Sequence, residues 1–138
     1  MAVYIGKGKN TAAAKTALQI NYVVSDIINP KIAAKYPDQS FQIRQVVGID
    51  TSKLFVARTG IRGSNDLVWV GRAANYAARL SSINEEGYSS YITDDVFQML
   101  NESAKYGSTE NRLMWEARSF EKLAITIHRS RWWWKTSA

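Results

Sequence analysis

The sequence contains no cysteine, which excludes a disulfide framework and any metal site built on thiolates. Proline is almost as scarce, with 2 residues in 138, and a hydrophobic content of 46% argues further against a disordered chain. No apolar run approaches the roughly 18 residues that a membrane-spanning helix needs, and the first residues lack a signal-peptide pattern. We therefore expect a cytoplasmic protein without a membrane partner.

Histidine is limited to His128, which lies in an apolar segment with no carboxylate or second histidine close by in the sequence. A structural role for it is more typical than catalysis, which would need partner groups. Acidic residues are outnumbered, with 12 Asp and Glu against 18 Lys and Arg and a net charge of +6. This charge suits an anionic ligand such as a nucleotide without requiring one.

The length fits a single domain, which we place at residues 1–138. Apolar and β-branched segments alternate with segments of helical periodicity, which predicts an α+β fold, an α/β sandwich of one sheet with helices against it. The expected strands are 1–5, 41–50, 53–59, 89–93, 112–120 and 122–130, and the expected helices are 11–29, 72–83 and 94–101.

Three of these expectations are specific enough to test. The helix should end at Asn29–Pro30, because proline breaks a helix interior. Strands 41–50 and 53–59 should pair, since only two residues separate them. Residues 1–5 should form a buried strand, either docked at the end of the sheet or continuing a domain that begins upstream.

The segment NDLVWVGRAANYAARL, residues 65–80, leads from an apolar stretch into an alanine-rich helix. Asn75 and Arg79 are four residues apart and therefore share one face of that helix. Taken alone, this spacing is explained by a solvated polar face opposite an alanine face that packs closely.

The order of the segments resembles the class III nucleotide cyclase homology domain over roughly residues 1–100. The family has, in this order, a Met-Ala-Val-Phe-like run, a helix, GIHTG, a glycine-bearing strand, DVIGDTVNLAARL and ILVS. This chain has, in the same order, MAVYIG, a helix, VVGIDTS, LFVARTG, VWVGRAANYAARL and SSYIT. The most specific part is the G-x-x-x-N-x-A-x-R-L pattern that starts at Gly71. GIDTS and the stretch from Arg58 to Leu80 are also similar to the bacterial pyrimidine cyclases of antiphage signalling (Pycsar-type).

The resemblance implies a ferredoxin-like cyclase domain with a mostly antiparallel sheet, helices on one side and a missing N-terminal part. It also implies cyclisation of a nucleoside triphosphate to a 3′,5′-cyclic monophosphate, in antiviral defence for the pyrimidine subgroup. Asn75 would orient the ribose, and Arg79 would stabilise charge on the α-phosphate during attack by the 3′-hydroxyl. Phosphoryl transfer depends on such positioning and on donors aimed at developing negative charge. Further substrate-binding candidates are Val68, Arg72 and Lys122, with Arg118 as an alternative to Lys122.

Several departures from the family pattern limit these expectations. The family's metal-binding carboxylates would fall upstream of Met1, so we expect Mg or Mn in the intact domain but none held by this chain, which alone should be inactive. Asp50 replaces the histidine of GIHTG. Val68 stands where purine-selective members have Asp or Cys, and its side chain cannot hydrogen-bond a base. That substitution is consistent with a pyrimidine base or with no base.

Family members build each active site between two domains, so the resemblance implies a homodimer with helix 71–83 near the interface. The C-terminal segment HRSRWWWKTSA interleaves Trp132–Trp134 with basic residues, a mixture that either stacks bases or packs on protein. We favour packing on a partner chain and do not expect nucleic acid as a partner. A catalytically silent nucleotide-binding or dimerisation module and a basic, Trp-rich nucleic-acid binder remain the alternatives.

Overall fold

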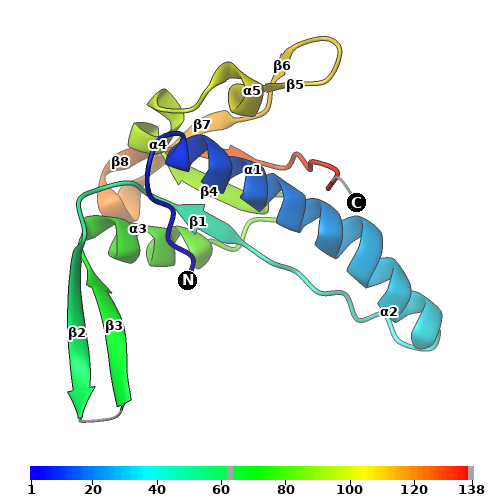
Figure 1. Cartoon of the computed structure of the whole chain (residues 1–138). Helices are drawn as coiled ribbons and strands as arrows, with labels where there is room; N and C mark the ends of the chain where they lie inside the picture. Colours follow the sequence, from blue (N-terminus) through cyan, green and yellow to red (C-terminus); the bar gives the residue numbers. More distant parts are fainter. Residues whose placement is uncertain (62–63, 137–138) are drawn as a thin grey trace.

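A computed structural model describes residues 1–61 and 64–136 of the chain, so Arg62–Gly63 and the last two residues of the tryptophan-rich segment lie outside the described residues. At its centre is a four-stranded sheet in the order β1-β4-β8-β7 (Figure 1). The strands are β1 (Val47–Ile49), β4 (Ser90–Thr93), β8 (Ile125–Ser130) and β7 (Glu116–Phe120). β1 and β4 are parallel and the other two pairs are antiparallel, which confirms the predicted α+β fold with a mostly antiparallel sheet.

Each face of this sheet carries its own core, because adjacent residues of β4 point to opposite sides. Ile92 packs with Leu18 of α1 (Lys9–Tyr22) and with residues of α4 (Asp94–Gln98) and α5 (Glu102–Lys105). Tyr91 packs with Leu80 of α3 (Arg72–Ser81) and with Ile127. The helices therefore divide between the two faces, whereas we expected them on one side.

One helical rod runs from Lys9 to Lys35 and passes Pro30, so the predicted stop at Asn29–Pro30 is wrong (Figure 1). α1 continues into a π-helical segment, Val23–Ile28, and then into α2 (Asn29–Lys35). The π segment shifts the hydrogen-bond register, and Pro30 then occupies the first turn of α2, where its missing N–H costs little. A proline is tolerated at that position even though the chain stays helical on both sides.

The strand pairing after this rod also differs from the prediction. Residues 41–46 form no strand, and only Val47–Ile49 joins the sheet. The hairpin is instead formed by β2 (Phe55–Ile61) and β3 (Ser64–Val70), in register from Phe55↔Val70 to Ile61↔Ser64. β2 and β3 have seven residues each, so together they form a longer ladder than the three residues of β1 could offer. β2 therefore pairs with the strand that follows it and not with β1.

Met1–Ile5 form no strand, which corrects the expectation of a buried one. Met1 and Ile5 are 87% and 82% exposed. Residues 1–4 lie beside β1 and, with α1 and α3, line a groove of about 200 Å³ along the edge of the sheet.

The two predicted C-terminal strands are both shortened by local breaks. Residues 112–120 divide into β6 (Arg112–Leu113), which pairs with β5 (Tyr106–Gly107), and β7, because Met114 and Trp115 turn into the core between them. β8 starts only at Ile125, after a short 3-10 helix at Glu121–Leu123.

The tryptophan-rich segment lies along α1 of its own chain. The Trp134 amide donates to the Leu18 carbonyl at 3.1 Å, and the Asn21 side-chain amide donates to the Trp132 carbonyl at 2.9 Å. Trp132 and Trp134 pack against the core, while Trp133 is 53% exposed beside Tyr22. Trp132 and Trp134 therefore pack within their own chain, whereas Trp133 stays half-exposed. None of the described helices combines the length and hydropathy that crossing a bilayer requires.

Candidate functional site

Helix α3, which carries the cyclase-like pattern, lies directly against β1 at a glycine. A Cβ atom at Gly48 would lie 2.6 Å from the Ser81 amide nitrogen and 2.7 Å from Leu80 Cβ, so a larger residue does not fit without displacing the helix. Ala73 and Leu80 are buried on the side of α3 that faces the sheet. Small residues on both elements thus fix how closely the helix approaches.

Asn75 and Arg79 lie on the opposite, solvent-facing side of α3, as their spacing predicted. Both are exposed, and neither side chain hydrogen-bonds or ion-pairs with another residue in the described part of the chain. The amide offers a donor and an acceptor, and the guanidinium offers a planar fork that fits phosphate oxygens. Both groups are therefore available to a ligand approaching this face.

Arg72, one turn before Asn75, is engaged by the protein itself. Its Nη2 lies 2.6 Å from Asp95 Oδ2 and donates to the Thr51 carbonyl at 2.8 Å, and its Nε lies 3.3 Å from Asp50 Oδ2. The hydrogen bond to Asp95, more than the neighbouring charges, raises the pKa of Arg72 above its ordinary value. Arg79 therefore has no side-chain partner within residues 1–61 and 64–136, whereas the Arg72 guanidinium is already engaged.

The other two substrate-binding candidates, Val68 and Lys122, lie on elements other than α3. Val68 is on β3, opposite Ala57 in the projecting hairpin, with 39% of its surface exposed. Lys122 is exposed on the 3-10 helix between β7 and β8. Their roles at a nucleotide remain predictions.

The carboxylates beside the first turn of α3 do not fit a divalent metal ion. The Asp50 side chain is fully buried, accepts a 2.6 Å hydrogen bond from the Thr93 hydroxyl, and faces the Arg72 guanidinium, which also holds Asp95. A cation already occupies the place that a metal would need. No cluster of three or more His, Cys, Asp or Glu residues suited to a metal occurs among residues 1–61 and 64–136.

The lone histidine has a carboxylate partner that the local sequence did not reveal. His128 is buried on β8, stacks on Phe97 with 3.9 Å between ring centroids, and places Nε2 2.8 Å from Asp94 Oδ1. This hydrogen bond holds the pKa of Asp94 below its ordinary value of 3.8. The two residues are 34 positions apart in the chain and come together only when β8 pairs with β4, which leads into α4, so no local sequence pattern indicates the contact.

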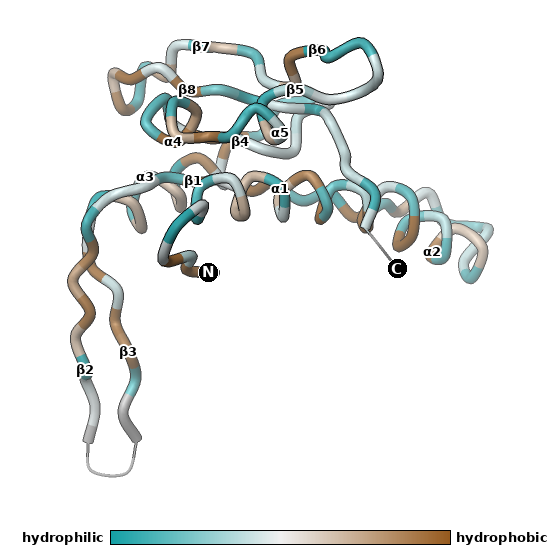
Figure 2. Tube along the Cα trace, turned by 45° about the horizontal axis from the view of Figure 1, so that its top comes forward, coloured by the Kyte–Doolittle hydropathy of each residue, from teal (hydrophilic) through white to brown (hydrophobic). Residues whose placement is uncertain are grey.

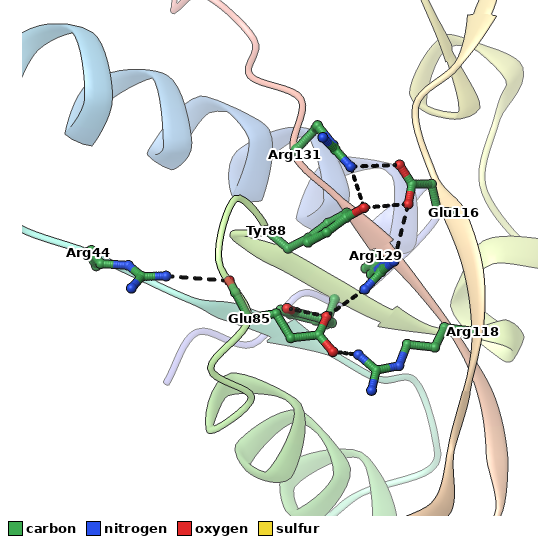
Figure 3. A network of polar contacts seen from close by, with 8 residues as sticks. Arg44, Glu85, Tyr88, Glu116, Arg118, Arg129 and Arg131 are labelled. Carbon is green, nitrogen blue, oxygen red and sulfur yellow. Dashed lines mark hydrogen bonds and ion pairs between the residues drawn. The ribbon is translucent and has the colours of Figure 1, made fainter.

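A cluster of ion pairs fastens the loop after α3 to the sheet (Figure 3). Glu85 pairs with Arg118 and Arg129, and it accepts a hydrogen bond from Tyr91 at 3.1 Å. Beside it, Glu116 accepts a 2.6 Å hydrogen bond from the Tyr88 hydroxyl, which holds the pKa of Glu116 below its ordinary value. Arg118, the alternative phosphate ligand, is therefore committed to Glu85.

Comparison with known proteins finds sequence relatives and a structural neighbour but no family model. No protein-family model matches the chain. It is 48% identical over 136 residues to a uridylate cyclase of Xanthomonas perforans, covering 98% of this chain and 57% of that protein. It is 48% identical over 134 residues to a uridylate cyclase of Burkholderia cepacia (97% and 56%), and 38% identical over 140 residues to one of Rhodovulum sp. (strain MB263; 98% and 58%). The chain thus spans a little over half the length of these relatives.

The structure resembles the crystal structure of the guanylyl cyclase Cya2, with a TM-score of 0.64, 12% sequence identity and coverage of 94% of this chain and 60% of that one. At this identity the likeness shows the fold. Together with the sequence relatives it defines the class: the chain is a class III cyclase-like domain. The three sequence relatives described above are all called uridylate cyclase.

Proposed function

We propose that this chain provides the Asn75–Arg79 half of a cyclase active site that converts a nucleoside triphosphate, with a pyrimidine base, to its 3′,5′-cyclic monophosphate. The observation that carries the proposal is the exposed pair on α3, which has no side-chain partner among the described residues, within a chain 48% identical to uridylate cyclases. Uridine triphosphate is accordingly the first substrate to test. We place the reaction in the cytoplasm, as expected from the sequence, and its product in antiviral signalling, as the resemblance implies.

In this reaction the 3′-hydroxyl attacks the α-phosphorus and pyrophosphate leaves. Negative charge grows on the non-bridging oxygens, so the Arg79 fork binds the transition state more tightly than the ground state. Asn75, one turn earlier, is placed to hold the ribose hydroxyl in line with the phosphorus. Magnesium or manganese would neutralise the triphosphate, but the carboxylates of this chain beside α3 do not fit that ion, so its ligands would come from another segment or chain.

A catalytically silent nucleotide-binding or dimerisation module is the second candidate. The observation that favours it is the engagement of Asp50 and Asp95 by Arg72. Nucleic-acid binding has less support, because the backbone of the tryptophan-rich segment is hydrogen-bonded to α1 and two of its three indoles pack against the core.

The experiment has two parts. The purified chain is first incubated with Mg²⁺ or Mn²⁺ and each of the four triphosphates, and we expect no cyclic product, although uridine triphosphate should bind. Robust turnover by the chain alone would contradict the proposal that the metal ligands lie elsewhere. Binding that never leads to turnover, even in the longest native form, would favour the silent module.

The second part replaces Asn75 or Arg79 by Ala in a form that turns over substrate. Because their contacts strengthen on the way to the transition state, kcat should fall by about 10²-fold or more while KM changes little. Near-normal rates in both folded variants would make the pair an ordinary solvent-facing feature of the helix.

We also propose a two-fold homodimer with α3 near the interface, since half a site on one chain needs a second chain to complete it. The β2–β3 hairpin, which leads into α3, supports this proposal. It projects from the body of the molecule and carries hydrophobic residues along both strands (Figure 2). Phe55, Leu67 and Val70 are 80%, 60% and 55% exposed, a pattern typical of a surface that meets a partner.

A further inference from the structure

The five residues Gly48–Ser52 follow the length of α3 from its last turn to its first. Gly48 lies against the helix near Ser81, as described above. At the other end, Thr51 accepts from Arg72 through its carbonyl, and Ser52 Oγ accepts from the Ala73 amide at 3.0 Å. The residue before the helix is a glycine, which has no side chain for a cap, so Ser52 supplies from another segment the acceptor that a helix start requires.

Asp50, in the middle of this segment, makes the arrangement dependent on Arg72. Its carboxylate is fully buried, and Oδ2 has no hydrogen-bond partner in the described part of the chain beyond its 3.3 Å approach to Arg72 Nε. A buried carboxylate without a nearby cation is strongly unfavourable. Arg72 balances this charge and at the same time reaches Asp95 on α4, so one side chain joins α3 to the segment that follows β1 and to α4.

From these contacts we propose that Arg72 is a positioning residue for Asn75 and Arg79 rather than a ligand of the substrate. It fixes where α3 starts and how the helix is rotated against the sheet, and this sets the direction of the two side chains one and two turns further on. The inference rests on the proposed function, because it assigns the positioning to those two residues. It also explains why polar groups of the Gly48–Ser52 segment form hydrogen bonds and an ion pair with the first residues of α3.

The test compares Arg72→Ala with Arg79→Ala, the same substitution two turns along the same helix at a residue without a described partner. Amide hydrogen exchange is measured over residues 72–81 of the full chain. Arg72→Ala should speed exchange in α3 by about tenfold or more, because it leaves Asp50 buried without its cation, and Arg79→Ala should leave exchange unchanged. If Arg72→Ala does not fold, Asp95→Asn, which weakens only one arm, should give a smaller rise. Unchanged exchange in the Arg72 variant would overturn the proposal.

A second readout separates positioning from simple stabilisation. In a form that turns over substrate, Arg72→Ala should lower kcat and leave KM within about twofold, and Arg72→Lys, which keeps the charge but not the fork, should recover part of the loss. A rise in KM with normal α3 exchange would make Arg72 a substrate ligand and overturn the inference. Faster exchange in a protein that binds no nucleotide would overturn the proposed function and, with it, the positioning role.

Discussion

At Gly48 the backbone of β1 touches the backbone of α3, and backbone cannot move aside as a flexible side chain can. We therefore expect Gly48→Ala to lower the free energy of unfolding by about 2–3 kcal/mol, measured by urea denaturation. Gly107→Ala is the matched comparison, since its added methyl would meet mainly the thioether of Met114, 2.7 Å away. Met114 can adopt other rotamers, so the loss there should be smaller. Equal losses would mean that α3 shifts freely on the sheet.

The Asp94–His128 pair gives the stability of the protein a defined acid dependence. Because the pKa of Asp94 is lower in the folded chain than its ordinary value of 3.8, the carboxylate stabilises the fold above that value. The contribution is lost as the pH falls below 3.8 and through the folded pKa. Denaturation at a series of pH values should show wild type more stable than Asp94→Asn at pH 6, with the difference shrinking toward pH 3. A constant difference would exclude this assignment.

At the scale of single elements, neighbouring residues of the tryptophan-rich segment differ in burial, and this difference can be tested by substitution. Trp132 packs against the core, whereas Trp133 is 53% exposed. Trp132→Ala should lower the free energy of unfolding by about 2–4 kcal/mol, and Trp133→Ala by about 1 kcal/mol or less. Thermal and urea denaturation of the two variants give the comparison. Similar losses would mean that the segment does not lie along α1 as described.

Elements with strong local signals were predictable from the sequence, while those decided by long-range pairing were not. Helix 72–83 and strand 89–93 carry their own periodicity and appear as α3 and β4. The pairing of β2 with β3 depended on which neighbour offers the longer ladder, and the passage of the helix through Pro30 depended on a π-helical segment. Neither feature can be predicted from the local pattern of residues.

The candidate site shows the same division. The spacing of Asn75 and Arg79 placed both on the solvent-facing side of α3, and the structure confirms that they are exposed. The engagement of Arg72 was missed because its partner Asp95 is 23 residues away in the chain and comes close only after α4 packs on the sheet. A local pattern identifies a side chain that could bind phosphate, but not whether the fold already uses it.

For the whole molecule, the proposed homodimer predicts a role for the projecting hairpin. Leu67→Asp adds a charge at a position 60% exposed in the single chain, so the monomer should fold normally while dimerisation weakens. Leu113→Asp, at a position 49% exposed on β6, is the matched control and should leave the dimer intact. Light scattering at micromolar concentration measures both. A 15.6 kDa mass for the wild-type chain would contradict the dimer.

The hairpin and the far end of the helical rod extend from the body in different directions, as Figures 1 and 2 show. From Val23 to Lys35 the rod contains no buried residue, so it adds length to the molecule without adding to its core. A compact chain of this size would have a radius of gyration of about 14 Å. The extended outline should give a larger radius, faster decay in small-angle scattering and greater friction during sedimentation. A single copy should therefore elute early from a sizing column, with the retention of a heavier sphere.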